Sequence, residues 1–497
     1  MTPRVSRSAL AGLDIGSSRI KCVVCDPAGT VLAAAERSTP LGARDADALA
    51  TAGLNALAEA VAASGRHPDA VGLTGMAETG VPLDRHGAQT GPLLAWADPR
   101  GTTEAGRLVR DTGAAALHAA TGVRPSAKAT LAKWCWLRAH LPHALDAMHV
   151  WCGAADLLAL ALTGRVATDA TFAQRTMAYD VHRGRWDTDL AGLAGVRTDR
   201  LPPVRPPGEP VGPLTDEAAR RVPGLRAGTP VVVAGHDHPV GAWAAGVRTA
   251  GAVADSMGTA EAVLTLTDDP PDSARTLAEG MGYGRSADGR HWYVLAGTGS
   301  CGALVEWYVD LVGLPLGAER HQALGVLLEA AGPGPTGVLV EPYLSGRSAP
   351  EPDPERRVAL HRLGPEDGPA RLALAVVEAT AYQARWMTET QRVLTGGGRP
   401  REVTLLGGPV AQPRWPRVKA AVAPWRTRVL AEHRAPAVGA ALLAARAAGP
   451  LADEPLPVHE ATASPQEDPD GYDRLYREAF LPLVRRPTAD TPPGSRP

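Results

Sequence analysis

Two stretches far apart in the chain follow the same outline, and this repeat is the feature that most limits the possible folds. Residues 10–15 and 20–25 are apolar runs on either side of the turn Gly16-Ser17-Ser18. Residues 251–266 repeat the outline around Gly258 and Thr259. Short apolar runs bounded by small turn residues predict strands. The repeat therefore predicts two similar units, related by internal duplication.

Helical patterns alternate with the predicted strands, which indicates an α/β fold. Residues 46–63 carry leucines and valine at helical spacing, and residues 70–74 are a further apolar run. Later segments continue the alternation: mainly helix over 102–194, strand at 230–234, helix at 299–311 and 370–394, strand at 403–406 and helix at 438–448. We predict one domain over residues 9–246, a second over 247–484, and a disordered tail over 485–497.

Composition excludes several classes of protein. The net charge of −2 and the pI near 6.7 argue against a nucleic-acid partner. No run of about 18 apolar residues occurs, so we expect no membrane span. The five cysteines form an odd set, which fits a reducing compartment and a cytoplasmic protein. Cys22 and Cys25 lie on one predicted strand and face opposite ways, which disfavours a redox or metal pair. We also expect a homodimer, although no motif supports it.

The two small-residue turns suit phosphate binding. Glycine lets backbone N–H groups approach a phosphate, and a neighbouring hydroxyl adds a donor. A single Gly-Ser turn also occurs in hairpins that bind no ligand. Two such turns in matching positions of the repeat indicate a polyphosphate held from both sides. Asp14 comes directly before the first turn, where a carboxylate could hold Mg²⁺ through water.

Asp237 follows the apolar run 230–234 and Gly235, at the place where the sheets of α/β proteins present residues to a ligand. By position alone it could instead cap a helix. His236 and His238 flank it and raise the question of a metal. Adjacent residues rarely point to one centre, so we expect each histidine to be hydrogen-bonded or solvated.

Other nucleotide-binding classes fit less well. Residues 297–302 spell G-x-G-x-x-G after a predicted strand, as in a dinucleotide-dependent oxidoreductase. That fingerprint requires a second strand ending in an acidic residue, whereas residues 313–331 are predicted to be helical. A P-loop kinase is excluded because the motif G-x-x-x-x-G-K-[ST] does not occur.

Residues 13–21, Leu-Asp-Ile-Gly-Ser-Ser-Arg-Ile-Lys, resemble the first phosphate motif of the FGGY carbohydrate kinases, which is similar to the opening of actin and the heat-shock chaperones. The resemblance continues in order to about residue 484. It includes Trp96-Ala97-Asp98-Pro99-Arg100, Thr121-Gly122, Leu162-Thr163-Gly164, Gly235-His236-Asp237, Gly258-Thr259, residues 341–346, residues 378–383 and residues 438–441.

The resemblance implies two ribonuclease-H-like domains of the actin-like ATPase type, with a cleft that closes over ATP and a sugar in the first domain. It also implies an enzyme that phosphorylates a hydroxyl of a sugar, sugar acid or polyol, with ATP and Mg²⁺. Asp237 would be the general base and Asp14 would assist Mg²⁺. The implied nucleotide-binding residues are Gly16, Ser17, Ser18, Lys21, Gly258, Thr259, Gly302, Gly407 and Gly408.

For the acceptor, the resemblance implies contacts from residues 76–78 and 96–100, together with Asp237 and His238. The candidates are Met76, Ala77 and Glu78, together with Trp96, Asp98 and Arg100, which are expected at the end of a neighbouring strand. Glu78 and Asp98 could bond hydroxyls, and Trp96 could stack on the apolar face of a sugar. Glycerol kinases have an arginine where Ala77 stands and xylulose kinases a histidine where Glu78 stands, whereas Trp96-Ala97-Asp98 resembles gluconate kinases.

Pro409 departs from the family pattern, because it replaces a backbone donor in the segment expected to border the adenosine. This departure leaves a second interpretation open, a non-catalytic actin-like nucleotide sensor. The acceptor, the hydroxyl attacked, the oligomeric state and the role of His236 and His238 are not determined by the sequence.

Overall fold

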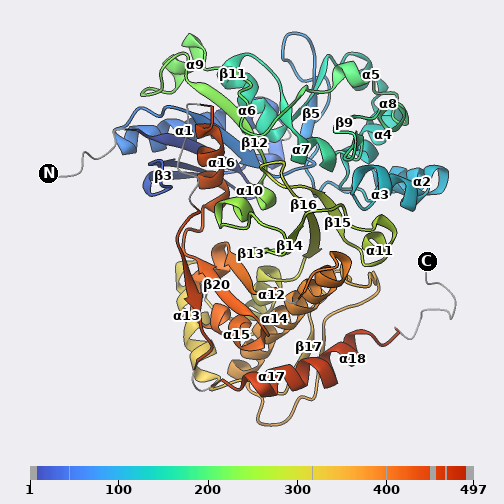
Figure 1. Ribbon diagram of the computed structural model, residues 1–497, viewed down its shortest axis with the longest axis vertical. Helices are drawn as coiled ribbons and strands as arrows, with labels where there is room; N and C mark the ends of the chain where they lie inside the picture. Colours follow the sequence, from blue (N-terminus) through green and yellow to red (C-terminus); the bar gives the residue numbers. More distant parts are fainter. Residues whose placement is uncertain are drawn as a thin grey trace. The chain divides into compact units, whose positions relative to one another are not determined.

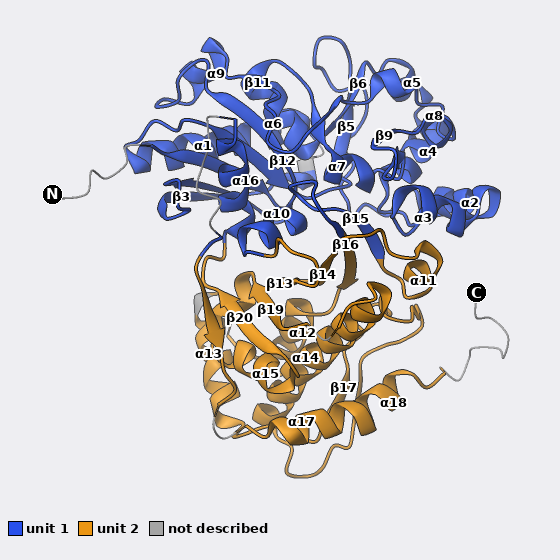
Figure 2. Cartoon of the chain, in the orientation of Figure 1, with its two compact units in different colours: residues 1–246, 282–292, 434–456 blue, residues 247–281, 293–433, 457–497 orange. Residues whose placement is uncertain are grey.

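Two sheets, each covered by helices, form the frame of this α/β chain, as the sequence predicts (Figure 1). The computed structural model describes residues 8–43, 45–315, 317–398, 400–447, 455–464 and 467–487. From residue 488 onward, the tail predicted to be disordered lies outside the described residues. The chain divides into unit 1, residues 1–246, 282–292 and 434–456, and unit 2, residues 247–281, 293–433 and 457–497 (Figure 2).

The sheet of unit 1 has six strands in the order β11-β12-β4-β1-β2-β3. Their bounds are β1 (Leu10–Ile15), β2 (Arg19–Cys25), β3 (Val31–Ser38), β4 (Val71–Gly75), β11 (Gly212–Pro213) and β12 (Pro230–His236). The first three strands form the antiparallel meander expected from the turn residues, and β4 runs parallel to both β1 and β12.

Helices pack on both faces of this sheet. On one face Leu13 and Ile15 share a core with Leu57 of α1 and Leu158 of α6. On the other face Gly12 and Gly72 lie against α16, where an added Cβ would stand 1.9 Å from the oxygen of Ala437 and 2.0 Å from that of Ala440. Any larger side chain at either glycine would push α16 off the sheet.

The remaining elements of unit 1 surround this frame. They are α1 (Ala46–Ser64), β5 (Gly80–Leu83), α2 (Thr102–Thr112), α3 (Ala114–Thr121), α4 (Thr130–His140), α5 (Pro142–Asp146), β6 (Val150–Gly153), α6 (Ala154–Thr163), β7 (Thr168–Asp169), α7 (Ala170–Arg175), β8 (Tyr179–Asp180), β9 (Arg185–Trp186), α8 (Thr188–Gly192), β10 (Val204–Arg205), α9 (Asp216–Arg221), α10 (Asp237–Ala244), β15 (Gly282–Arg285) and α16 (Ala435–Ala445).

Unit 2 repeats the local topology. Its strands follow the order β16-β14-β13-β19-β20-β21. Strands β13 and β14 are antiparallel around the second small-residue turn, and β19 is parallel to β13, as β4 is to β1. The strand bounds are β13 (Val253–Met257), β14 (Glu261–Thr267), β16 (Trp292–Thr298), β17 (Leu339–Glu341), β18 (Ala359–His361), β19 (Glu402–Leu406), β20 (Arg426–Leu430) and β21 (Val458–Ala461).

The long helix α14 runs through the core of unit 2, where Trp386 and Met387 are fully buried. The helices of this unit are α11 (Ser273–Ala278), α12 (Gly302–Leu311), α13 (Ala318–Ala330), α14 (Pro369–Leu394), α15 (Arg414–Val422), α17 (Pro469–Leu475) and α18 (Leu481–Val484), with a short π-helical turn at Tyr476–Phe480. Three aromatic side chains near the end of this unit, those of Tyr472, Tyr476 and Phe480, are buried in its core.

Three observations in the described part of the chain concern the alternatives weighed above. Cys22 and Cys25 are both buried in β2 and form no disulfide. In the described part of the chain, no helix combines the length and the apolar character needed to cross a membrane. Helix α13 occupies the segment in which a dinucleotide fingerprint would need its second strand.

Candidate active site

Three strands of unit 1 end side by side and bring distant residues together. Ile15 at the end of β1 pairs with Gly75 at the end of β4, and Gly75 pairs with His236 at the end of β12. In an open α/β sheet, the carboxyl ends of the strands are where ligands bind. Asp14, the segment after Gly75, and Asp237 therefore share one edge of the sheet.

Asp237 is the first residue of α10, and His236 is the N-cap. A carboxylate there is favoured by the partial positive charge of the helix N-terminus. Asp237 Oδ1 accepts the His238 amide hydrogen at 2.7 Å and lies 3.1 Å from His236 Nε2. The Asp237 side chain keeps about 24% of its surface exposed, so the carboxylate is open to a ligand.

The electrostatics of this edge suit proton transfer. Burial raises the pKa of Asp237 to about 7, although the hydrogen bond from the His238 amide favours the ionised form. Burial also lowers the pKa of His236 and brings that of His238 to about 4, so both imidazoles are neutral near pH 7. A carboxylate with a near-neutral pKa can take a proton from a hydroxyl group.

The two flanking histidines lie close to the Asp237 carboxylate, although adjacent residues rarely point to one centre. One ligand atom from each of His236, Asp237 and His238 lies within 4.8 Å of the others. The reason is the sharp change from strand to helix at His236, which places consecutive side chains on one side instead of alternating them. The nearer imidazole, that of His236, has its Nε2 atom 3.1 Å from Asp237 Oδ1.

Asp14 is a buried carboxylate that lacks compensation. It is 8% exposed, and its Oδ1 has no hydrogen-bond partner among the described residues. Burial and the charge of Asp237 raise the pKa of Asp14, whereas Lys21, its cross-strand neighbour, lowers it. Two nearby carboxylates with an orphaned oxygen atom fit a hard divalent cation such as Mg²⁺.

The first small-residue turn presents its hydroxyl groups to solvent. The Gly16 amide donates to the oxygen of Arg19 at 3.1 Å, and Thr39 Oγ1 donates to the oxygen of Gly16 at 2.7 Å, which fixes the turn. Ser17 and Ser18 are exposed at its tip. The turn can therefore offer donors to an anion without rearranging.

In unit 2, three distant segments meet at the second turn. The Gly302 amide, at the start of α12, donates to the oxygen of Gly258 at 2.9 Å, and the Ala303 amide donates to that of Thr259 at 3.0 Å. Gly407 has φ +106°, and an added Cβ would stand 2.0 Å from the oxygen of Met257. The predicted residues Gly258, Thr259, Gly302 and Gly407 are therefore neighbours, and Gly408 beside them has open space where a Cβ would lie.

Sequence reasoning missed a buried ionic cluster behind this turn. Lys419 Nζ donates to Asp255 Oδ2 at 2.6 Å and also to Glu261 Oε1, and these two carboxylates flank the turn on β13 and β14. Cys301 Sγ, directly before α12, lies 3.7 Å from Glu261 Oε1. Burial and the charge of Asp255 raise the pKa of Glu261 to about 8. The cluster ties the turn to α12 and α15.

The acceptor candidates of unit 1 lie around Glu78, which has φ +53°, unusual for a residue other than glycine. Arg175 at the end of α7 donates from Nε to Glu78 Oε1 at 2.7 Å. Lys133 on α4 donates to the backbone oxygen of Glu78 at 2.6 Å. Met76 and Ala77, the two residues before Glu78, are buried. The strained loop is therefore held from two sides.

Trp96, Asp98 and Arg100 lie in a loop, not at a strand end as predicted, because pairing stops at Leu94, which bridges Gly80. The Trp96 amide donates to Thr79 Oγ1 at 3.0 Å, which ties this loop to the Glu78 segment. Arg100 Nε contacts both oxygens of Asp98, at 2.9 and 3.0 Å. Lys128 Nζ stands 5.1 Å from the centroid of the Trp96 ring.

Arg175, Lys128, Lys133 and Lys419 were not predicted as site residues. One signal could have found three of them, because the chain has only four lysines. Lys21 pairs with Asp14 across the sheet, Lys128 and Lys133 surround the Glu78 loop, and Lys419 supports the second turn. Arg175 could not be found in this way, because arginine is common in the chain.

Comparisons with known proteins agree with this arrangement. Residues 9–244 match the N-terminal domain, and residues 253–448 the C-terminal domain, of the model of the FGGY family of carbohydrate kinases. The chain is 30% identical to the xylulose kinase of Streptomyces rubiginosus, over 96% of this chain and 98% of that one. It is 29% identical to the glycerol kinase of Gloeobacter violaceus, over 82% and 85%.

Comparison with solved structures also identifies a xylulose kinase. The crystal structure of the xylulose kinase from Rhodospirillum rubrum superposes with a TM-score of 0.84 and 26% identity, over 96% of this chain and 98% of that one. Its fold is the two-domain actin-like ATPase fold expected from the sequence. The chain therefore belongs to the FGGY family of carbohydrate kinases, enzymes that phosphorylate a sugar or polyol with ATP.

Proposed function

We propose that this kinase transfers the γ-phosphoryl group of ATP to a hydroxyl of a sugar, sugar acid or polyol, with Asp237 as the general base. The observation that carries the proposal is the Asp237 carboxylate, which is partly exposed at a strand end and has a pKa raised to about 7. Phosphoryl transfer needs a positioned base and neutralised charge more than covalent catalysis.

Unit 1 would hold the acceptor. Its hydroxyl would donate a hydrogen bond to Asp237 and lose the proton to that carboxylate as the new O–P bond forms. Glu78, Trp96 and Arg100 would orient the acceptor from the neighbouring loops, together with Met76, Ala77, Asp98 and His238. The charges of Glu78 and Arg175 already act on Asp237, which supports placing the acceptor next to the base.

Mg²⁺ fits Asp14, whose orphaned oxygen and neighbouring carboxylate call for a cation. When bound with ATP, Mg²⁺ would neutralise charge on the phosphates. Lys21, as the cation across the strand pair, would help to keep Asp14 ionised.

The nucleotide would use both small-residue turns. Ser17 and Ser18 supply exposed hydroxyls beside Gly16, and Gly258 and Thr259 form the turn in unit 2. Gly302 would lie near the phosphates, and Gly407 and Gly408 would border the adenosine. The open space at Gly408 supports a ligand beside it.

The test is acceptor-dependent release of ADP from MgATP across pentuloses, hexuloses, aldonates and polyols. We expect Asp237→Asn to lower kcat at least ~100-fold on the accepted substrate, because the shape stays and the base is lost. The KM for MgATP should change little. The matched control is Asp216→Asn, an exposed aspartate that also begins a helix of unit 1, and it should keep full activity. Turnover close to that of the unmodified enzyme in Asp237→Asn would refute the proposal.

A further inference from the structure

The charge around the Glu78 loop is unbalanced. Its two carboxylates are each matched by an arginine, Glu78 by Arg175 and Asp98 by Arg100. Lys128 and Lys133 then add two positive charges, and among the described residues neither lysine forms an ion pair. This group thus carries a surplus of two positive charges, in a chain whose net charge is −2.

Of the two lysines, Lys128 is open to a ligand, whereas Lys133 adds its positive charge from the protein interior. Lys133 is buried, and its ammonium group is bonded to a neutral carbonyl oxygen. Burial lowers the pKa of Lys133 to about 8, which shows that the local carboxylates do not offset its desolvation. Lys128 is exposed and stands over the ring of Trp96, the proposed stacking residue. A cation without an anionic partner is stabilised when an anion binds beside it.

Residue choice supports this view. Of the 51 basic residues of the chain, four are lysines and the others arginines, and two of the four are at this loop. An ammonium group is a compact charge with three rotatable donors, whereas a guanidinium group is a wide planar fork. A short ammonium group suits a small anionic substituent next to a sugar-like carbon chain.

We propose that the acceptor carries an anionic group, a carboxylate as in a sugar acid or a phosphate ester, which binds beside Lys128 and Lys133. This inference rests on the proposed function, because it assigns the opposite end of the same acceptor. The hydroxyl to be phosphorylated lies at Asp237, and the anionic end lies toward Trp96. The charges of Glu78 and Arg175 act on both Asp237 and Lys128, so the base and this lysine share one neighbourhood.

The test compares acceptors of equal carbon number: an aldonate, the corresponding neutral alditol and ketose, and a sugar monophosphate. We expect kcat/KM to be at least about tenfold higher for one of the two anionic acceptors than for the neutral ones. Preference for the aldonate would identify the anion as a carboxylate, and preference for the sugar monophosphate would identify it as a phosphate ester. Lys128→Gln should reduce this preference about tenfold, mainly through the KM of the anionic acceptor, and Lys128→Arg should restore part of it.

Arg107→Gln is the matched control, since it removes one exposed positive charge from α2 in the same unit. It should leave the preference unchanged. Preference for the neutral acceptors, or an equal effect of Lys128→Gln on all acceptors, would overturn the inference and leave the kinase intact. A rise in the KM of MgATP in Lys128→Gln, whichever acceptor is used, would also overturn it. Absence of ADP release with every acceptor would overturn the proposed function as well.

Discussion

At the scale of single residues, the sequence shows where Asp237 lies, whereas the fold determines its pKa. Its place after a buried strand is visible in the sequence and marks an edge where ligands bind, whereas the role of general base came from the family resemblance. Its raised pKa is a tertiary effect, because it comes first from burial and then from its neighbours. The two flanking imidazoles remain neutral near pH 7 and so add no charge to the site.

This electrostatic setting predicts a pH dependence. The base is active as a carboxylate, and its pKa is raised to about 7, so acidification protonates it near neutrality. We expect kcat/KM for the acceptor, measured at saturating MgATP between about pH 5.5 and about pH 8.5, to rise with pH and level off above about pH 7.5. The acidic limb should approach tenfold per pH unit.

His238 does not account for that limb, since its pKa lies near 4. Asp14 titrates with Asp237, because each carboxylate raises the cost of ionising the other. Near-ultraviolet circular dichroism over the same range checks that the fold is intact. A flat profile through pH 7 would contradict the assigned pKa of the base.

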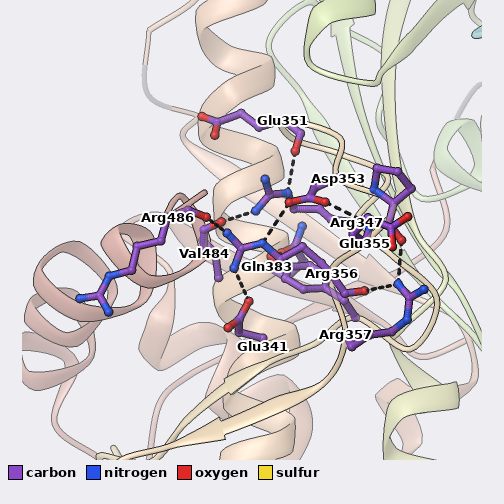
Figure 3. Close-up of polar contacts among 12 residues, drawn as sticks. Glu341, Arg347, Glu351, Asp353, Glu355, Arg356, Arg357, Gln383, Val484 and Arg486 are labelled. Carbon is purple, nitrogen blue, oxygen red and sulfur yellow. Dashed lines mark hydrogen bonds and ion pairs between the residues drawn. The ribbon is translucent and has the colours of Figure 1, made fainter. Parts of the chain in front are cut away.

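At the scale of elements, hydrogen bonds from two buried arginines hold α18 and Arg486 against the rest of unit 2 (Figure 3). Arg347 donates from Nε to the oxygen of Glu351 at 2.6 Å and from Nη1 to the oxygen of Val484, the last residue of α18. Arg356 donates to Glu341 Oε2 at 2.6 Å and to the oxygen of Arg486. Both guanidinium groups are buried, so the segment after β17 and helix α18 depend on each other.

Arg356→Met should therefore destabilise the protein. The substitution leaves Glu341, 6% exposed, without the guanidinium group that faces it. Breaking a buried pair by removing one partner costs about 3–5 kcal/mol. We expect that loss in the free energy of unfolding, measured by chemical denaturation. Arg357→Met is the control, because this neighbouring arginine is exposed and bonds only backbone oxygens among its recorded contacts. Equal stability of the two variants would show that the buried contact is not stabilising.

At the scale of the whole molecule, unit 1 is not one continuous stretch of chain. Residues 282–292 and 434–456 belong to it although residues 247–281 and 293–433 form unit 2 (Figure 2). Helix α16 packs on β1 and β4 through the glycine contacts at Gly12 and Gly72. Tyr283, from the other returning segment, is buried and its backbone oxygen accepts from Gln174 of α7.

A fragment that ends at residue 246 should consequently fail to form a stable fold. It lacks α16, so Val240 of α10 and the face of the sheet at Gly12 and Gly72 would lose the helix that covers them and be exposed to water. We expect binding of a hydrophobic dye and no cooperative thermal transition. A version with residues 434–456 joined to residue 246 by a flexible linker should regain part of the transition. Cooperative unfolding of the shorter fragment would contradict this account of unit 1.

The sequence determined the elements and much of the site. An apolar run bounded by turn residues predicted β1, and helical patterns predicted α1 and α14 within a few residues, because such patterns report which residues are buried. The two turns and Asp237 were visible because they lie at strand ends, where turn residues interrupt an apolar run. The start of α12 was placed three residues too early, since the helical pattern extends over the preceding loop.

Only the tertiary structure brought together residues that no local pattern connects. Lys419 lies 164 residues along the chain from Asp255 and 158 from Glu261, and Arg175 lies 97 residues from Glu78. The packing of α16 in unit 1 could not be predicted either, because the sequence of an apolar helix does not specify which sheet it packs on. Local propensity sets which elements form, whereas contacts between distant residues are decided by packing and by the pairing of buried charges.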